Sequence, residues 1–525
     1  MKGKFSIPHI LSVDHGDSDS RPNSASAISA GDPVVLGLIN LQVASCVSDY
    51  FMHKINTYIS QLDPDLHTFA YLRKSPFLLT AVLVVTAKAF ESDVYPDLNA
   101  HAEKLFADCF RRGDKSTKVI QAIWKEPNDS RAWTSVGLSI RIAMDLGWHR
   151  LSANQTHNSE LTEIQRREQR NIERTMLVLF VYDRSLSLQT GKPWMIERTQ
   201  LIESADSWWR HPYAIPNDLL LCSFVTLRLI TADTFDLLVP SKTDLASRQE
   251  RLLSDLDSRI NGWQTKWLDA IAACPAKDSQ FCHAFLINFY TSHSRLQLSS
   301  FSLQAVHNHN FGINNMKAFW LSYVSAVKML QLVAESSPLL YLAQDSIHVM
   351  TAYAAIFLIK LTLSSPSIIT LEFEKTVIGA IRRVAVTFAA LSAPRTSSCS
   401  YQATFMENIL SEFSRARGAL MTSAGQLAAS PMPLENPHTL DDHRPLSQQK
   451  LSRQQESGSL EPYNASSISP AKRQPHHNGQ GVRAQDTHPS LPSDDLRFLF
   501  DDADTWADMF ANAGFNIQEG VFFCE

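Results

Sequence analysis

RAWTSVGLSIRIAMDLGWHR at residues 131–150 and RNIERTMLVLFVYDRSLSLQTGKPWM at 170–195 are two apolar stretches with charged residues set inside them. In both, apolar or small residues recur at steps of three and four, which places them along one side of a helix. In the first stretch these residues are Trp133, Val136, Ile140, Ala143 and Gly147. In the second they include Ile172, Met176, Leu179, Phe180, Leu186 and Ser187. The two stretches therefore predict a pair of helices that pack in a protein core.

The charged residues inside these helices need partners. Arg141 and Asp145 lie one turn apart and can pair with each other. Asp183 follows the spacing of the stripe that is predicted to be buried. A buried carboxylate that lost its partner would cost about 3 to 5 kcal/mol. Arg174 and Arg184 are the nearby candidates for that partner.

The second helix is predicted to end at Gly191 and Pro193, because glycine can take the left-handed cap and proline cannot continue a helix. At this point the residues resemble a known family. DSRAWTSVGLSIRIAMDLGWHR (129–150) is similar to the aromatic-glycine-arginine-aspartate helix of the regulatory middle domain of fungal zinc-cluster transcription factors, and ERTMLVLFVYDRSLSLQTGKPWMI (173–196) resembles the helix that follows it. The residues of the family motif are Trp133, Gly137, Arg141, Asp145, Asp183, Arg184, Gly191 and Pro193.

Two further matches lie upstream in the family's order. They are GDPVVLGLIN at 31–40, and LDPDLHT at 62–68 together with SPFLLTAVL at 75–83. The resemblance covers about residues 31–423. It implies a fungal-specific regulatory domain of a transcription factor that acts in the nucleus and is not an enzyme.

Composition limits the classes of function. The chain has 525 residues, enough for two or three domains or for one large helical array. Its formal net charge is −5, so no overall basic field draws it onto nucleic acid, which argues against DNA contact by this chain alone. The seven cysteines are sparse and odd in number, as suits reduced thiols in the cytosol or nucleus.

The chain is not expected to have a membrane as a partner. The N-terminus has no sustained apolar core, so it is a poor secretory signal. The longest apolar stretches, 77–87 and 349–363, fall short of the roughly 20 apolar residues that cross a bilayer or carry polar breaks. Both are predicted to be buried core helices.

Helical spacing continues along the body, and alternation typical of strands is absent, so the fold is predicted to be all-α: a large multi-helix domain at 31–423. A disordered lead at 1–30 precedes it, and a disordered linker at 424–490, rich in Pro, Ser, Gln and His, follows it. The segment 204–217, with adjacent Trp208 and Trp209, is predicted to be a structured loop, its aromatic rings packing on the core rather than lining a pocket. Helices are predicted at 34–60, from Pro76, and at 98–110, 117–124, 220–239, 244–270, 278–303, 315–335, 345–363, 368–392 and 402–423.

The C-terminal segment at 491–525 differs in composition from both the helical domain and the linker. DDLRFLFDDADTWADMF, residues 494–510, holds six aspartates and one arginine. This acidic amphipathic composition is typical of activation segments, which lay an apolar face into a groove of a partner. The alternative is a C-terminal helix docked on the protein's own core. The apolar face of the candidate activation segment includes Leu496, Leu499, Phe500, Trp506 and Phe510.

The sequence departs from the family where DNA would be bound. A zinc cluster needs closely spaced cysteine thiolates, commonly beginning with C-x2-C, and the closest pair here is Cys274 and Cys282. Zinc is therefore expected only if a cluster precedes these residues. Three explanations stay open: an incomplete gene model, an isoform, or a natural regulator that works without its own DNA contact.

Other chemistry has little support, and neither a catalytic site nor a cofactor is predicted. Glycine-rich phosphate loops and the Gly-x-Ser-x-Gly elbow of hydrolases are absent from the sequence. Cys282, His283 and His293 lack a fourth metal ligand, and the aspartates at 501–504 lack a second magnesium-binding motif. Two short basic patches could serve nuclear import, but a solvated face or linker charge is favoured. They are Arg166-Arg167-x-x-Arg170 and Lys472-Arg473. His307-Asn308-His309 is predicted to be a polar turn.

The sequence thus predicts a nuclear transcriptional regulator whose acidic tail recruits transcription machinery or a coactivator. A DNA-binding partner or a homodimer is also expected. The alternative is a ligand-responsive or dimerising helical module without an activation role, which sequesters a DNA-binding partner.

Overall fold

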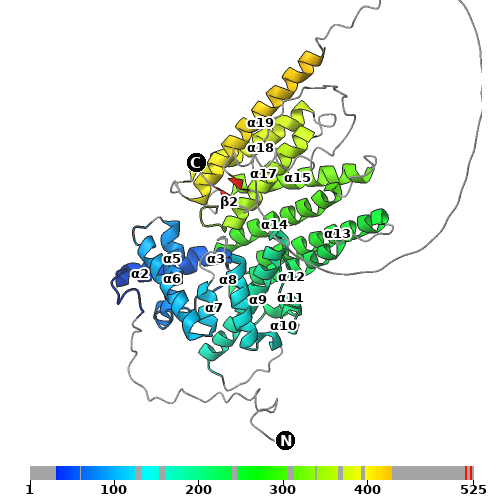
Figure 1. Ribbon diagram of the computed structural model, residues 1–525. Coiled ribbons are helices and arrows are strands. Elements are labelled where there is room, and N and C mark those ends of the chain that lie inside the picture. Colours follow the sequence, from blue (N-terminus) through cyan, green and yellow to red (C-terminus); the bar gives the residue numbers. More distant parts are fainter. Residues whose placement is uncertain are drawn as a thin grey trace, which may run out of the picture. The chain divides into compact units, whose positions relative to one another are not determined.

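A computed structural model describes the helical body and little of the chain beyond it (Figure 1). The described part is all-α, as predicted, apart from one short pair of antiparallel strands. The predicted lead at 1–30 lies outside the described residues, as does most of the predicted linker; the linker's first residues, 424–428, instead continue α19. The structure describes residues 31–59, 61–90, 92–123, 132–152, 161–190, 192–238, 245–304, 313–336, 340–364, 370–391, 397–428, 515–516 and 521–522.

The N-terminal helices gather around α5 (Pro76–Ala89), which carries proline in its first turn as the sequence predicts. Residues 77–84 of α5 are all buried, because α2, α6 and α7 pack around it. This group also includes the two short helices predicted at 98–110 and 117–124. Its members are α2 (Leu41–Tyr50), the π-helix η1 (Phe51–Ile55), α3 (Asn56–Ile59), α4 (Phe69–Leu72), α5, α6 (Tyr95–Arg112) and α7 (Thr117–Ile123).

The two opening stretches form α8 (Ala132–Asp145) and α9 (Glu163–Thr190), which confirms the predicted pair. A short 3-10 helix, η2 (Trp148–Arg150), follows α8. Helix α9 packs against α8 and also against α12 (Pro216–Leu238). It ends where the Gly-x-Pro sequence predicts, although Gly191 itself lies outside the described residues.

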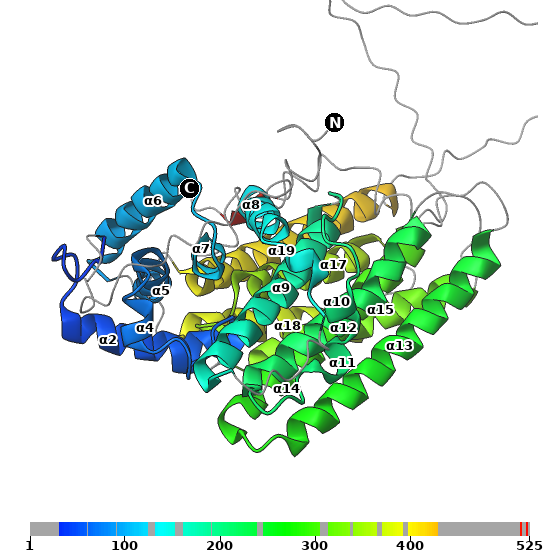
Figure 2. The ribbon, with the colours of Figure 1, turned by 90° about the horizontal axis from the view of Figure 1, so that it is seen from below.

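Long helices make up the rest of the body, close to the ranges that the sequence predicts. Neighbours in the chain pack on one another: α12 on α13, α13 on α14, α14 on α15, and α15 on both α17 and α18. Figures 1 and 2 show α12, α13, α14 and α15 side by side. The helices are α13 (Leu245–Ala273), α14 (Lys277–Gln304), α15 (Ile313–Glu335), α17 (Asp345–Ser364), α18 (Leu371–Ala390) and α19 (Ser398–Ala428).

The helix predicted over 34–60 is wrong at its start. Turns precede it, and α2 begins at Leu41. Asn40 caps α2, since its side chain accepts a backbone N–H of the first turn at 2.8 Å. Gly37 has a φ of 72°, a left-handed conformation that a helix does not continue through. Capping and turn residues therefore outweigh the apolar spacing in this stretch.

Two helical turns lie at the segment predicted to be a loop, one just before it and one near its start. They are α10 (Gln200–Glu203) and α11 (Ala205–Trp208). The side chain of Thr199 caps α10 by accepting the amide of Ile202 at 3.4 Å. The loop prediction was wrong for 205–208, which form α11 despite the two tryptophans and two prolines of the segment.

In the part of the chain that the structure describes, one helix is long and apolar enough to cross a membrane. It is the window Ser346–Leu363 in α17, with mean hydropathy 1.6. In the folded body 72% of this window is buried. The prediction that length and polar breaks keep this stretch from qualifying as a span was therefore wrong, whereas its burial fits the predicted core helix.

By its internal contacts the chain divides into two units, 1–417 with 496–525, and 418–495. In the first unit the described residues are the helical body and a two-stranded pair in which β1 (Phe515–Asn516) runs antiparallel to β2 (Val521–Phe522). In the second unit the structure describes only 418–428, the last turns of α19.

Candidate functional site

A buried ionic cluster joins α9 to the start of α12. Both Arg174 and Asp218 are 0% exposed, and they form a two-pronged pair: Nε to Oδ1 at 2.6 Å and Nη2 to Oδ2 at 3.0 Å. Arg170 adds a contact from Nη2 to Oδ2 at 3.3 Å. The carboxylate also accepts the backbone N–H of Ile215 at 3.1 Å. Burial disfavours the charge on Arg174, but the Asp218 carboxylate outweighs this and raises the pKa of Arg174.

Trp208 closes this cluster on one side. The guanidinium carbon of Arg170 lies 3.3 Å from the centre of a Trp208 ring, a cation-π contact. The indole N–H of Trp208 donates to Glu173 at 2.7 Å. Burial raises the pKa of Glu173, although that hydrogen bond opposes the shift. Trp208 therefore packs on the core, as predicted, and Trp209 packs at 6.1 Å from Trp267.

Two more buried aspartates form ion pairs with arginines. Asp63, in the sequence LDPDLHT, pairs with Arg167 of α9 at 3.1 Å. Asp32, in GDPVVLGLIN, pairs with Arg73 at 2.8 Å. Both aspartate side chains are 0% exposed. The sequence motifs that resemble the family thus place carboxylates where they tie turns to helices.

Asp183 is buried as predicted, but its partner is different. Its carboxylate accepts the backbone N–H groups of Met195, at 2.9 and 3.1 Å, and Ile196, at 2.9 Å. Arg184 donates to the carbonyl of Ile196 at 2.9 Å, and Arg174 pairs with Asp218 instead. Burial is the main cause that raises the pKa of Asp183, against these amide hydrogen bonds. The predicted arginine partner is therefore wrong, because the chain after α9 turns back and brings its own amides to the carboxylate.

Replacing Asp183 with alanine is expected to lower the free energy of unfolding by about 3 kcal/mol, because two buried amides and the Arg184 charge lose their compensation. Urea denaturation measures this change. Asp145→Ala is the matched control, since Asp145 forms an exposed ion pair with Lys115 and such pairs contribute less than about 1 kcal/mol. Equal effects of the two changes would contradict a structural role for Asp183.

The other family-motif residues serve packing and the surface. Trp133 is half-buried, with Lys192 at 5.2 Å from its ring centre, and Gly137 is buried where an added Cβ would meet Met195 at 3.3 Å. Arg141 and Pro193 are exposed. The ion-pair partner of Asp145 is Lys115 rather than the predicted Arg141, because the end of α8 faces the turn after α6. Residues that lie outside the described part are Gly191, Leu496, Leu499, Phe500, Trp506 and Phe510.

The basic patch on α9 is neither a free import signal nor a solvated face. Arg166 donates to the hydroxyl of Tyr213 at 3.2 Å, and Arg167 is only 15% exposed at its side chain. Arg170 is 6% exposed at its side chain and binds Asp218. These arginines instead join α9 to neighbouring segments. The second patch, Lys472-Arg473, lies outside the described residues.

The residues of the weak metal motif lie buried on α14. Cys282, His283 and His293 are all buried. Burial lowers the pKa of His283 to about 4 and that of His293 to about 3. Among the residues that the structure describes, no three His, Cys, Asp or Glu side chains are grouped to hold a metal ion. The predicted polar turn at 307–309 lies outside them.

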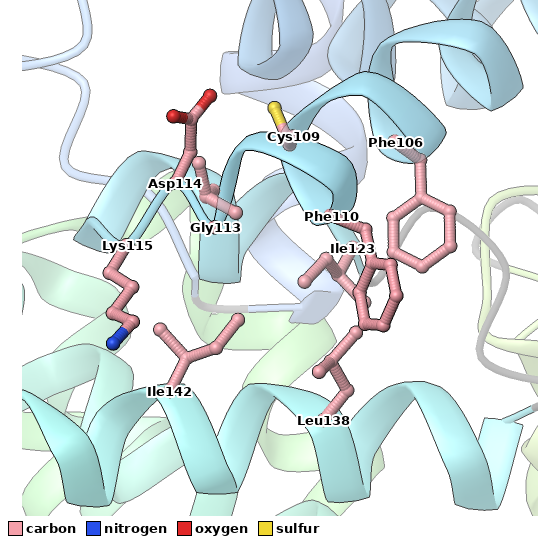
Figure 3. A pocket seen from close by; sticks show the side chains of 10 residues that line it. Phe106, Cys109, Phe110, Gly113, Asp114, Lys115, Ile123, Leu138 and Ile142 are labelled. Carbon is pink, nitrogen blue, oxygen red and sulfur yellow. The ribbon is translucent and has the colours of Figure 1, made fainter.

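An apolar pocket lies between α6, α7 and α8, and its volume is about 170 Å³ (Figure 3). Figure 3 shows Phe106 and Phe110 of α6 above Leu138 and Ile142 of α8. Phe110 is 69% exposed, an unusual position for a phenylalanine. The pocket is lined by Phe106, Cys109, Phe110, Gly113, Asp114, Lys115, Val119, Ile123, Leu138 and Ile142.

The pocket is suited to binding an apolar group. An apolar cavity of about 150 Å³ can hold benzene, so the space here matches one aromatic ring or a short branched alkyl group. Its two charged residues already have partners: Asp114 pairs with Arg112 at 2.7 Å and Lys115 pairs with Asp145. Burial raises the pKa of Cys109, which keeps the thiol protonated and unreactive.

The roles of two buried aspartates, Asp218 and Asp63, were not predicted from the sequence. Apolar spacing gives no role to Asp218, and Asp63 stands only within the motif LDPDLHT, although both are fully buried. A usable signal was present in α9, where Arg167, Arg170 and Arg174 recur at steps of three and four. Arginines along the buried stripe of a helix predict buried acids elsewhere in the chain. The pocket had no comparable signal.

Comparisons with known proteins point to fungal gene regulators. No family model matches the chain, and no solved structure matches it. Protein priB of Lentinula edodes is 32% identical over 358 residues, which are 67% of this chain and 60% of that protein. The transcriptional activator of proteases prtT of Emericella nidulans is 24% identical over 358 residues, which are 62% of this chain and 51% of that protein. The chain thus spans only part of the length of these relatives, and its similarity to both suggests a fungal transcription-factor-like family.

Proposed function

We propose that this chain is a fungal transcriptional regulator that acts in the nucleus through RNA polymerase II-type gene regulation. The observation that carries the proposal is its similarity, over 62% of the chain, to a protein named as a transcriptional activator. The same similarity supports a regulator without catalytic activity. The order of the four sequence motifs adds independent support, because they resemble the regulatory middle domain of that class.

In this proposal the helical body receives a signal and the acidic segment at 491–525 passes it on. Six aspartates and large apolar residues in 494–510 support recruitment of transcription machinery or a coactivator. The chain spans 60% and 51% of its two relatives. We therefore assign DNA contact to a DNA-binding partner or to sequence of a longer protein, where a zinc cluster would reside.

A reporter experiment tests the acidic segment. Residues 490–525 fused to an unrelated DNA-binding module should raise reporter expression above that of the module alone. A matched fusion in which Phe500 and Trp506 are replaced by serine should lose the increase, since the apolar face makes the contact with a partner groove. Equal protein levels are checked by immunoblot. Reporter expression no higher than that of the bare module would remove the activation role.

The alternative is a ligand-responsive module that sequesters a DNA-binding partner. The pocket between α6, α7 and α8 supports it, because this apolar space of about 170 Å³ is open to a small ligand. Deleting 490–525 separates the two functions. An activator should lose expression of its target genes, whereas a sequestering module should keep its effect.

A further inference from the structure

Arg228 of α12 is a buried cation without an acid. The residue is 5% exposed, and its Nε is buried with no hydrogen-bond partner. Among the described side chains no carboxylate pairs with it, and the group that favours its charge is the hydroxyl of Tyr290. Two other buried arginines differ, because Arg170 and Arg174 both bind Asp218. Arg228 lacks the carboxylate partner that those two arginines have.

A second unsatisfied group lies beside it on α14, a helix that packs against α12. The guanidinium carbon of Arg228 lies 5.8 Å from the ring centre of Tyr290. The ring of His293 lies 6.5 Å from that of Tyr290. His293 is 6% exposed, and its Nδ1 is buried without a partner. Burial, and to a lesser degree the charge of Arg228, lowers the pKa of His293. Two adjacent helices thus bring two polar groups without partners to one place.

Physical chemistry favours an anion at this place. A charge taken out of water is unfavourable unless it is paired, and the ring face of Tyr290 accepts no hydrogen bond from Nε. The guanidinium fork matches a carboxylate or phosphate with two parallel hydrogen bonds. A neutral imidazole can add a third donor. We infer that Arg228 and His293 form a binding site for a compact oxyanion, the carboxylate or phosphate group of a small metabolite.

The site goes beyond the proposed regulatory function and does not depend on it. It lies on α12 and α14, whereas the apolar pocket lies between α6, α7 and α8. The two sites suit different chemistry, because the pocket accepts an apolar ring and the arginine site accepts a negative charge. A negative reporter experiment would not affect the inference of an anion site. A negative anion-binding experiment would likewise not affect the proposed regulatory function.

Thermal unfolding of the full chain tests the site. The melting temperature is measured in a phosphate-free, carboxylate-free buffer that is titrated with inorganic phosphate or, separately, with succinate. Sodium chloride holds the ionic strength constant. We expect a saturable rise of roughly 3 °C once the anion reaches about ten times its Kd. A rise with phosphate alone or with succinate alone supports the site and identifies the oxyanion that it prefers.

Two variants decide where the anion binds. Arg228→Met should abolish the rise and should melt at a higher temperature than the wild type when no anion is present, because it removes an unpaired buried charge. Arg295→Met is the matched control: Arg295 is a partly buried arginine of α14 that pairs with Asp257 at 2.9 Å, and its variant should keep the anion response. Arg228→Lys keeps the charge without the fork, so it should weaken the apparent affinity by about tenfold.

Two results would overturn the inference. One is the absence of a saturable rise with either anion in the wild-type chain. The other is a rise that Arg228→Met retains, since the anion would then bind elsewhere. Circular dichroism of each variant establishes that it is folded, and Arg228→Lys provides the reading if Arg228→Met does not fold.

Discussion

Replacing Asp218 with alanine is expected to lower the free energy of unfolding by about 3 to 5 kcal/mol. The change leaves Arg174 as a fully buried cation and takes a contact from Arg170. It also removes the acceptor for the Ile215 amide at the start of α12. Urea denaturation followed by circular dichroism measures the loss.

Asp206→Ala is the matched control for this change. Asp206 also pairs with a cation, Lys266, but both side chains are largely exposed. Such pairs contribute less than about 1 kcal/mol. A double change of Arg174 to methionine and Asp218 to leucine should recover much of the stability, because the buried Arg174 charge goes with its partner and Arg170 keeps Glu173 at 3.7 Å. A double variant no more stable than Asp218→Ala would contradict this account.

Mild acid is expected to destabilise the body strongly. Burial lowers the pKa of His67 and of His283 to about 4, and that of His293 to about 3, from 6.5. These histidines stay neutral in the fold, whereas the unfolded chain binds protons below pH 6.5. Their contribution is fully present above that pH and is lost as the pH falls toward 4. Between pH 7 and pH 5 the three histidines together should remove about 5 kcal/mol.

Urea denaturation at pH 7, 6 and 5 measures this dependence. Replacing His283 with leucine should remove about a third of it, because one of three equivalent groups no longer titrates. His149→Gln is the control, since His149 is exposed and its replacement should leave the dependence unchanged. Burial raises the pKa of Glu173 and of Asp183, so protonation of these carboxyl groups in the fold opposes part of the loss as the pH falls. Stability that does not change between pH 7 and pH 5 would contradict the prediction.

The helices could be predicted from the sequence because local spacing fixes them. The predictions over 315–335 and 345–363 match α15 and α17 to within two residues at each end. The start of α2 was missed because Asn40 and Gly37 act through single hydrogen bonds and backbone angles rather than through apolar periodicity. Local signals thus predict where helices lie better than where they begin.

The partners of the buried charges could not be predicted, because they come from distant segments. Arg167 and Asp63 lie 104 positions apart, and Arg174 and Asp218 lie 44 apart. Even Asp183, whose burial the spacing predicts, takes its hydrogen bonds from amides that depend on a turn of the chain after α9. Helical periodicity predicts which side chains are buried but not which residues they contact.

The hydrogen bonds of Asn56 have a consequence for synthesis of the chain. Its side chain holds Leu62 by hydrogen bonds at 2.7 and 3.0 Å, and its carbonyl accepts from Asn217, 161 positions later, at 3.0 Å. A ribosome adds about 5 to 20 residues per second, so Asn56 waits roughly 8 to 30 s for Asn217 to be made. During that interval the contact between Asn56 and the start of α12 is missing. We expect the N-terminal helices to reach their full stability only after α12 has emerged.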